Sequence, residues 1–426
     1  MMNRRDFFKL ASLAGIAIIP SSSMAGLPEY GGPDQRPHAY EGPFWIFVNA
    51  AGGWDPTLLC DPKGRANEEE MDPVNMYFSG DILSAGNIQY APIGYNDTFF
   101  QKHYQKLLVV NGIDMQTNGH DSGSRHAWSG RLVEGFPSLA ALIAAQNGPE
   151  LPMSYLSFGG YDFTAGLVAR TRSGNINALS RIAYPERADP DNPDSNFHSN
   201  KAAELIAATQ AARQAQQLQD AKLPVEHAAM SAMFTANGGA NELKLLQEYL
   251  PDEFGDNSVH RQAQIALAAY RAGICASVNI NMGGFDTHGD HDNQHQARLQ
   301  TLLEGIDLIW DEAEIQGIAD RVVVVVGSDF GRTPTYNDNN GKDHWSVSSM
   351  MLMGAGISGN RVVGASTAKH QPLNINPSSL AVSDNGIHVQ PEHIHYALRK
   401  LTGIADGPFA QIFPLVPEEP LAGLLG

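Results

Sequence analysis

Aspartate and histidine residues gather in four short, glycine-containing segments of the chain. These segments are residues 52–55, 118–126, 283–291 and 328–345. Carboxylate oxygens and neutral imidazole nitrogens are ligands that zinc and manganese accept in proteins. A metal ion held by such groups could polarise a phosphoryl or sulfuryl oxygen, or generate hydroxide. If the four segments meet in space, they predict a metal-dependent hydrolytic site.

The candidate metal ligands come from three of these segments, and His120 from the remaining one is expected close by. The candidates are Asp55, Asp286, His288, His291, Asp329 and His344. We expect one or two divalent ions, Zn or Mn, at this site. Purely structural roles stay open, because Asp55 could form a turn and Asp329 could belong to a structural loop. His288, His291 and His295 could likewise form one solvated helix face, because their spacings of three and four residues stack side chains.

Three further residues are candidates for catalysis: Ser122, His126 and Arg332. Ser122 lies in a glycine-containing stretch near His126 and could act as a nucleophile. No Gly-x-Ser-x-Gly elbow is present, so a serine-hydrolase triad has little support, and turn formation is the alternative role for Ser122. Arg332 could hold an oxyanion through two hydrogen bonds, or pair with a surface carboxylate.

The four segments follow predicted strands, which is what would bring them together. Apolar runs predict strands at 44–49, 107–110, 274–280, 321–326 and 350–353. The valine run at 321–326 is typical of a buried parallel strand. In open α/β sheets, ligands bind at the carboxyl ends of the strands. We therefore expect the polar segments to open on one crevice.

Helical patterns separate the strands and define the fold class. They cover 137–146, 201–223, 225–234, 241–250, 258–272, 290–318 and 391–401. This order predicts an α/β fold with a doubly wound, mostly parallel central sheet over residues 44–426, and a helical insertion near 135–270. A glycine pattern at 354–359 is similar to a dinucleotide-binding loop. The residues after it read as a strand rather than a helix, so we expect no nucleotide site.

Composition and charge narrow the classes of function. The chain has 426 residues, of which 42% are hydrophobic and 17% charged, so it can bury a large core. Its formal charge of −18 argues against a nucleic-acid partner. Cys60 and Cys275 are the two cysteines in the sequence, which excludes a disulfide scaffold and a cysteine-rich metal site.

The N-terminus predicts export. Arg4 and Arg5 precede an apolar stretch at 10–19, and small residues suit cleavage after Ala25. The alternative is a buried or amphipathic N-terminal helix. The apolar stretch is too short to span a bilayer, and we expect no membrane span elsewhere. The pattern predicts a twin-arginine signal peptide at 1–25, a Gly- and Pro-containing linker at 26–43, and a mature protein in the periplasm.

Taken together, the motifs resemble the bacterial family catalogued as domain of unknown function 1501. They are the twin-arginine leader, Gly-Gly-x-Asp at 52–55, Gly-Gly-Phe-Asp-Thr-His at 283–288, Ser-Asp-Phe-Gly-Arg-Thr-Pro at 328–334 and Gly-x-Asp-His-Trp at 341–345. The resemblance covers most of residues 44–405. That family is similar in fold to the alkaline phosphatase and sulfatase superfamily. The resemblance implies a two-metal site that hydrolyses phosphate or sulfate esters, with a small-molecule ester or anionic ligand as partner.

The same resemblance implies roles for single residues. Asp55 resembles the metal-ligating aspartate after the first strand, and Asp286 with His288 or His291 resembles an Asp–His pair on one metal. Asp329 resembles the aspartate of a late Asp-His dipeptide, His344 the final histidine, and Ser122 is the nearest candidate for the hydroxyl nucleophile. Phe330 replaces the histidine of that dipeptide, which implies that one metal position is remodelled or lost. A catalytically degenerate ligand- or partner-binding protein is the alternative, and an exported oxidoreductase is a third hypothesis.

Overall fold

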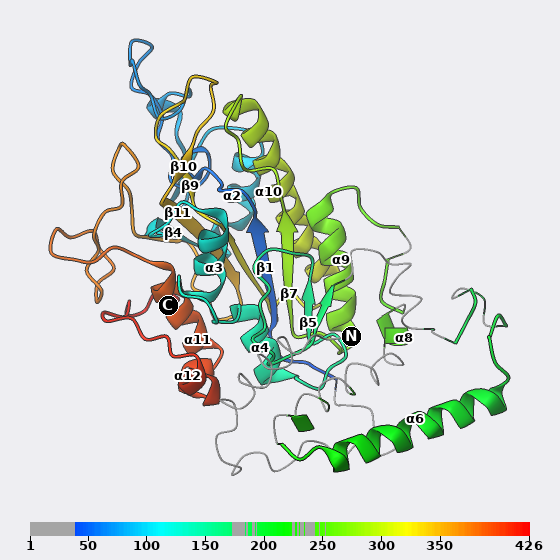
Figure 1. Cartoon of the computed structure of the whole chain (residues 1–426). Helices are drawn as coiled ribbons and strands as arrows, with labels where there is room; N and C mark the ends of the chain where they lie inside the picture. Colours follow the sequence, from blue (N-terminus) through cyan, green and yellow to red (C-terminus); the bar gives the residue numbers. More distant parts are fainter. Residues whose placement is uncertain are drawn as a thin grey trace.

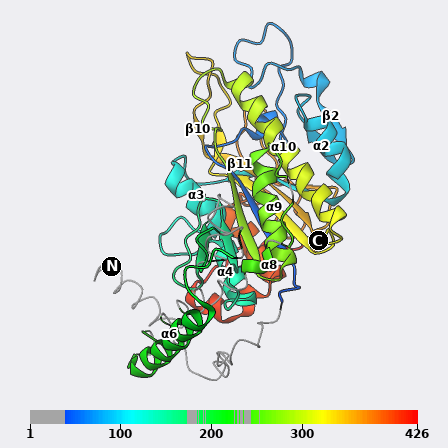
Figure 2. The same cartoon turned by 90° about the vertical axis from the view of Figure 1, so that its right-hand side faces the viewer.

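The computed structural model of the chain describes residues 39–172, 194–223 and 253–426, together with parts of 184–192 and 226–251. An eight-stranded sheet forms the centre of this part, with helices on both of its faces (Figures 1 and 2). The predicted signal peptide at 1–25 and most of the predicted linker at 26–43 lie outside the described residues. So do much of the predicted helix at 225–234 and parts of the one at 241–250.

The sheet is parallel except for one strand. Its order is β12 (Arg361–Val363), β4 (Leu107–Asp114), β11 (Val347–Gly354), β8 (Val322–Ser328), β1 (Phe44–Ala50), β7 (Ser277–Met282), β5 (Tyr155–Ser157) and β6 (Arg170–Arg172). Strand β11 runs antiparallel to its neighbours β4 and β8, and the other pairings are parallel. The predicted fold class and all five predicted strands are confirmed. The strand expected after the 354–359 glycine pattern is β12.

Successive side chains along each strand point to opposite faces of the sheet, so a hydrophobic core forms on each face. In β8, Val322, Val324 and Val326 face one core, while Val323 and Val325 face the other. Fully burying a valine stabilises the fold by roughly 1.5–3 kcal/mol. Helices α2 (Asn96–His103), α9 (Ser258–Arg271) and α10 (His291–Ile315) cover the first core, and α3 (His120–Ser129), α4 (Leu139–Asn147) and α11 (Pro391–Leu401) cover the second. The predicted helices at 137–146, 258–272, 290–318 and 391–401 are therefore confirmed.

The segment at 135–270 contributes to the sheet as well as to helices. Strands β5 and β6 extend the sheet beyond β7, so part of the predicted helical insertion belongs to the core. By contrast α6 (Asn200–Asp220) has no buried residue and lies apart from the sheet (Figure 1). Its alanines and glutamines favour a helix without packing. No described helix is both long and apolar enough to cross a bilayer.

Shorter elements complete the described fold. Besides short 3-10 turns, they are α8 (Leu243–Leu246), α12 (Pro408–Ile412), the ribbon of β2 (Leu83–Ala85) with β3 (Ile88–Tyr90), and the ribbon of β9 (Gly331–Arg332) with β10 (His344–Trp345). The last ribbon matters for the site. Because β11 is antiparallel, it starts where the parallel strands end, and β10 just before it lies at that same edge. Residues from four loops and one ribbon therefore meet there.

Candidate metal centre

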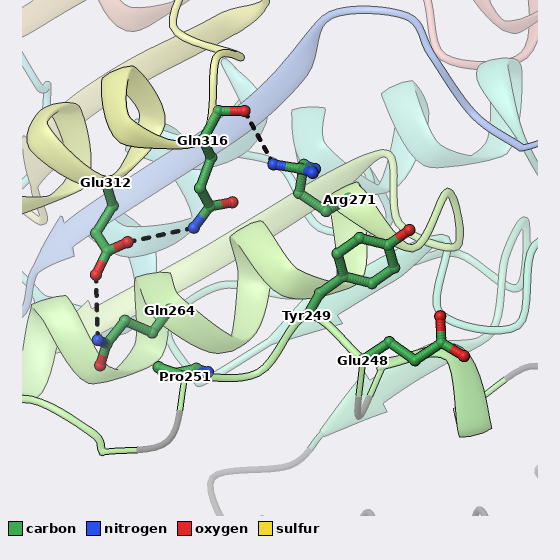
Figure 3. A pocket seen from close by; sticks show the side chains of 7 residues that line it. All are labelled: Glu248, Tyr249, Pro251, Gln264, Arg271, Glu312 and Gln316. Atoms are coloured by element: carbon green, nitrogen blue, oxygen red, sulfur yellow. Dashed lines mark hydrogen bonds between the residues drawn. The ribbon is translucent and has the colours of Figure 1, made fainter.

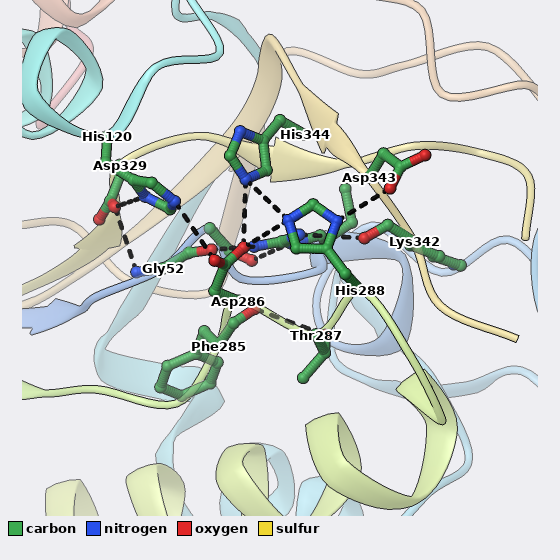
Figure 4. Close-up of polar contacts among 12 residues, drawn as sticks. Gly52, His120, Phe285, Asp286, Thr287, His288, Asp329, Lys342, Asp343 and His344 are labelled. Atoms are coloured by element: carbon green, nitrogen blue, oxygen red, sulfur yellow. Dashed lines mark hydrogen bonds and ion pairs between the residues drawn. The ribbon is translucent and has the colours of Figure 1, made fainter. Parts of the chain in front are cut away.

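Three histidines converge on the carboxylate of Asp286 at the carboxyl edge of the sheet (Figure 4). The Nε2 atoms of His288 and His344 lie 2.9 and 3.1 Å from Asp286 Oδ1, and 3.1 Å from each other. His120 Nε2 lies 3.5 Å from Asp286 Oδ2. In a tetrahedral site with metal–ligand bonds of about 2.0 Å, neighbouring ligand atoms are about 3.3 Å apart. Ligand atoms of His120, Asp286 and His344 all lie within 4.8 Å of one another, and His288 lies beside two of them, so this spacing suits a shared divalent ion.

The outer nitrogen of each histidine is held by an oxygen atom. Metal-ligating histidines usually donate their second ring N–H to a carboxylate or carbonyl, which fixes the tautomer and the ring orientation. Here each Nδ1 has such a partner, so each Nε2 is left to accept. The partners are Asp329 Oδ2 for His120, Asp343 Oδ1 for His288 and the carbonyl oxygen of Asn118 for His344, each at 2.8 Å.

Local structure explains how the ligand groups reach one another. Asp286 and His288 lie in the loop after β7, and His344 on β10 pairs directly with Arg332 on β9. His120 is the first residue of α3, a helix in the segment that the sequence suggested only as a polar loop. Gly123 lets α3 approach β8, because a Cβ there would lie 2.4 Å from the carbonyl oxygen of Asp329.

Arg332 holds the central carboxylate in place. Its guanidinium is fully buried and donates to Asp286 Oδ1 at 2.7 Å, and also to the carbonyl oxygens of Gly53 and Lys342 at 2.8 and 3.0 Å. Burial raises the pKa of Asp286, but the hydrogen bond and the charge of the Arg332 guanidinium, together with the nearby His344 and His288 rings, outweigh it and lower that pKa to about 2. The carboxylate is therefore ionised at neutral pH. Of the two roles predicted for Arg332, holding an oxyanion or pairing with a carboxylate, the structure shows the second, with Asp286 as the carboxylate.

Asp329 and Phe330, the two residues that follow β8, contact the imidazole rings of the site. Asp329 Oδ2 accepts from His120 and from the backbone N–H of Gly52, while Oδ1 is buried with no hydrogen-bond partner among the described residues. Burial raises the pKa of Asp329 despite its bond to His120. The ring of Phe330 packs against the rings of His120 and His344, with centroids 4.9 and 4.5 Å apart. Phe330 thus supports the two imidazoles sterically and offers no ligand atom of its own.

Asp55 and His291 lie in a second, fully buried cluster rather than at the Asp286 centre. His291 Nε2 is 3.0 Å from Asp55 Oδ2, and the ammonium of Lys342 is 2.6 Å from the same oxygen. Asp55 Oδ1 accepts from Thr57 instead. The predicted Asp–His pair is therefore Asp286 with His288, and Asp55 has no free carboxylate oxygen.

The alternative of one solvated face for His288, His291 and His295 is wrong. His291 and His295 are completely buried, whereas the His288 side chain is 46% exposed. Helix α10 begins only at His291, after Asp290 takes a left-handed conformation with φ of 44°. That turn rotates His288 out of the helical phase. His295 Nε2 accepts the backbone N–H of Asp55 and so helps to hold the buried cluster.

Ser122 and His126 lie on α3 but turn away from Asp286. The hydroxyl of Ser122 donates to the carbonyl oxygen of Gly119 at 3.1 Å and lies 2.6 Å from Thr117 Oγ1, as in the structural alternative. His126 is buried, donates from Nδ1 to Met115 at 2.9 Å, and lines a separate cavity of about 300 Å³. Residues that the sequence prediction missed are Asn118, Lys342 and Asp343. Asp343 adjoins His344 in its motif, and that proximity was the available signal.

A separate cavity lies between α9 and α10, and its polar lining groups hydrogen-bond to one another (Figure 3). Its volume is about 310 Å³, and Gln264, Arg271, Glu312 and Gln316 line it. Glu312 accepts from Gln264 and Gln316, both at 3.2 Å, and Arg271 donates to the carbonyl oxygen of Gln316 at 2.9 Å. These groups satisfy one another, whereas the imidazoles at Asp286 present nitrogen atoms to one another. The Asp286 centre is therefore the candidate site.

The chain has a mostly parallel α/β sheet with the candidate site at its carboxyl edge, and it belongs to a known protein family. It is the family described as "Protein of unknown function (DUF1501)", whose model matches residues 45–390. The resemblance inferred from the motifs is thereby confirmed. A comparison with curated proteins found no match.

Several solved structures are similar to the chain. A putative sulfatase from Bacteroides thetaiotaomicron is 13% identical, covering 90% of this chain and 75% of its own, with a TM-score of 0.35. The lipoteichoic acid synthase LtaP from Listeria monocytogenes is 8% identical, covering 93% of this chain and 78% of its own, with a TM-score of 0.37. The alkaline phosphatase from the Antarctic bacterium TAB5 is 10% identical, covering 76% of this chain and 95% of its own, with a TM-score of 0.32.

Proposed function

We propose that this chain is an exported, metal-dependent hydrolase of phosphate or sulfate esters. One observation carries the proposal: three histidines turn Nε2 toward the Asp286 carboxylate while oxygen atoms hold every Nδ1. Asp286, His120, His288 and His344 would hold the ion, and the donor set of nitrogens and one carboxylate suits Zn or Mn. When bound, the ion supplies Lewis acidity toward an ester oxygen.

The chain's own residues orient the ligands and leave them open to a substrate. Arg332 fixes the Asp286 carboxylate, and Asp343 and Asp329 fix the rings of His288 and His120. The side chains of Asp286 and His344 are 46% and 24% exposed, so a ligand in solution can reach them. Structural zinc sites are closed, and catalytic ones keep an open position. This exposure supports a catalytic role over a purely structural one.

The identity of the nucleophile stays a prediction. Ser122 lies two residues after His120 on α3, with its hydroxyl held by Gly119 and Thr117. To act on an ester at Asp286, the hydroxyl would have to leave these partners. The change Ser122→Ala separates the two possibilities. Loss of turnover with unchanged metal content supports Ser122 as nucleophile, and unchanged turnover excludes it.

A second candidate function is a metal-containing binding protein without turnover. It is favoured by the buried ion pair between Lys342 and Asp55. Because Lys342 occupies the Asp55 carboxylate, the Asp286 centre is the ion position that remains for catalysis. Such a protein would hold an anionic ligand through its metal, and would differ from a hydrolase only in lacking turnover. Both candidates fit the export signal predicted at 1–25, and we propose a periplasmic location for either.

The test combines metal content with ester hydrolysis. Purified protein is analysed for bound elements and assayed with p-nitrophenyl phosphate and p-nitrophenyl sulfate, with and without chelator. We expect a bound divalent ion and chelator-sensitive release of nitrophenol. Asp286→Asn should remove both, while Asp311→Asn, a partly exposed aspartate on α10 that pairs with Lys102, serves as the matched control. Bound metal without turnover on any ester would favour the binding protein. Absence of metal would contradict both candidates.

A further inference from the structure

Lys342 places a positive charge inside the protein beside the candidate site. Its side chain is completely buried, and its ammonium lies 2.6 Å from Asp55 Oδ2 and 2.7 Å from Asn75 Oδ1. The ring centroid of Tyr336 lies 5.2 Å from the same ammonium. A buried charge is costly unless it is paired and hydrogen-bonded, so this lysine must be compensated closely. Asp55 supplies that compensation.

The groups around Lys342 form a set that would suit a divalent cation. Asp55 offers a carboxylate oxygen, Asn75 an amide oxygen and His291 an imidazole nitrogen, all from fully buried residues. Carboxylate and carbonyl oxygens suit magnesium, calcium and manganese, and imidazole suits zinc. Burial raises the pKa of Asp55, but the charge of Lys342 and the hydrogen bond from His291 hold it well below its usual range. The carboxylate is thus ionised and its partner is an ammonium ion.

Lys342 also ties the ribbon that carries His344 to two other parts of the site. Its backbone N–H donates to the carbonyl oxygen of Thr287 at 3.1 Å, next to Asp286, and its own carbonyl accepts from Arg332 at 3.0 Å. Its side chain reaches Asp55 in the loop after β1. Asp343 and His344, the next two residues, face the Asp286 centre. A shift of Lys342 would therefore displace both an imidazole ligand and the carboxylate that orients His288.

We propose that the ammonium of Lys342 is a built-in cation that replaces a metal ion at Asp55 and positions the ribbon carrying His344. The inference rests on the proposed function only in taking the Asp286 centre as the exchangeable ion position. On this view Lys342 is a positioning residue, and the chain binds one exchangeable divalent ion. Removing the lysine side chain would leave Asp55, Asn75 and His291 as an open cage.

The test is whether Lys342→Ala gains a metal ion. Wild type and variant are loaded with Zn²⁺ or Mn²⁺, desalted, and analysed for metal per chain. We expect one additional equivalent in Lys342→Ala, and no additional equivalent in Asp55→Asn/Lys342→Ala, which lacks the carboxylate. His291 and Tyr336 also line a cavity of about 550 Å³, so solvent lies close to one side of the cage. A lysine with a merely structural role would not change the metal count.

The outcomes separate this inference from the proposed function. A folded Lys342→Ala with the same metal content as wild type overturns the inference. Wild type without metal would contradict the proposed function, whereas the difference between variant and wild type still tests the role of Lys342. If Lys342→Ala does not fold, Lys342→Met is compared with Asp55→Asn/Lys342→Met. Recovery of folding in the double variant supports the charge role, and failure equal to that of the single variant overturns it.

Discussion

The Nε2 atoms of His288 and His344 lie 3.1 Å apart, although the two residues are 56 positions apart in the chain. Both rings donate from Nδ1, so both Nε2 atoms carry lone pairs that face each other and Asp286 Oδ1. Three acceptors this close repel one another unless a proton or a cation lies among them. A divalent ion offsets all three at once, which is why the arrangement indicates a metal centre.

Asp286→Asn should abolish or strongly weaken metal binding. The aspartate provides the negative charge toward which the imidazoles turn, and an asparagine keeps the shape while removing the charge. We expect the loss of affinity to exceed the roughly 10–100-fold that removal of an outer-shell partner costs. Titration with Zn²⁺ and Mn²⁺ against Asp311→Asn measures it. Equal affinities in the two variants would contradict the site.

Asp343→Asn should weaken the metal without removing it. The carboxylate of Asp343 accepts from His288 Nδ1 at 2.8 Å and from Asn337 Nδ2 at 3.1 Å, so we expect it to act on the centre through the His288 ring. Loss of such a partner lowers metal affinity by roughly 10–100-fold. Asp338→Asn is the matched control, because Asp338 is an exposed aspartate in the same connection. An unchanged affinity in Asp343→Asn would show that His288 is not a ligand.

The sequence predicted the edge of the sheet where the site lies and several of the residues that meet there, but it left open which histidine pairs with Asp286. Val322 to Val326 identified a buried strand, and the rule for strand ends then placed Asp286 and Asp329 correctly at one edge. The choice between His288 and His291 could not be read from spacing. It depends on the left-handed turn at Asp290, which separates His288 from the helix that begins at His291.

Long-range partners were equally hidden. Lys342 and Asp55 are 287 residues apart, and no local pattern connects them. The sequence therefore suggested Asp55 as a metal ligand. A carboxylate after the first strand can pair with a metal ion or with a lysine, and the sequence does not distinguish the two. The helix at His120 was missed for a related reason: Gly119 and Gly123 resemble turn residues, and only packing against β8 shows why Gly123 is needed.

Replacing Arg4 and Arg5 together by lysine should trap the precursor in the cytoplasm. The paired arginines followed by a short apolar stretch predict recognition as a twin-arginine signal, and lysine keeps the charge without the guanidinium. Cell fractionation and the size of the protein on a gel measure the result. A single Arg4→Lys variant reports how far one arginine suffices. Normal processing of the double variant would contradict the predicted route.

The protein should lose stability as the pH falls below neutrality, and His395 should contribute to this loss. The ring is buried on α11: Nε2 donates to the carbonyl oxygen of Ala127 at 2.8 Å, and Nδ1 has no partner among the described residues. Burial, together with the nearby charge of Arg399, lowers the pKa of His395 to about 3. Between about pH 6.5, the ordinary value for histidine, and that folded-state value, the unfolded chain binds a proton that the folded chain does not. Unfolding is therefore favoured as the pH falls.

The size of the effect follows from one proton. A group protonated only in the unfolded state changes the free energy of unfolding by up to about 1.4 kcal/mol per pH unit. His395→Gln keeps an N–H donor for Ala127 but cannot titrate. Urea unfolding of both proteins at pH 7.5, 6 and 5, with chelator present so that metal release does not contribute, should show a shallower pH dependence in the variant. A loss of stability in His395→Gln that is the same at every pH would mean that His395 contributes only packing.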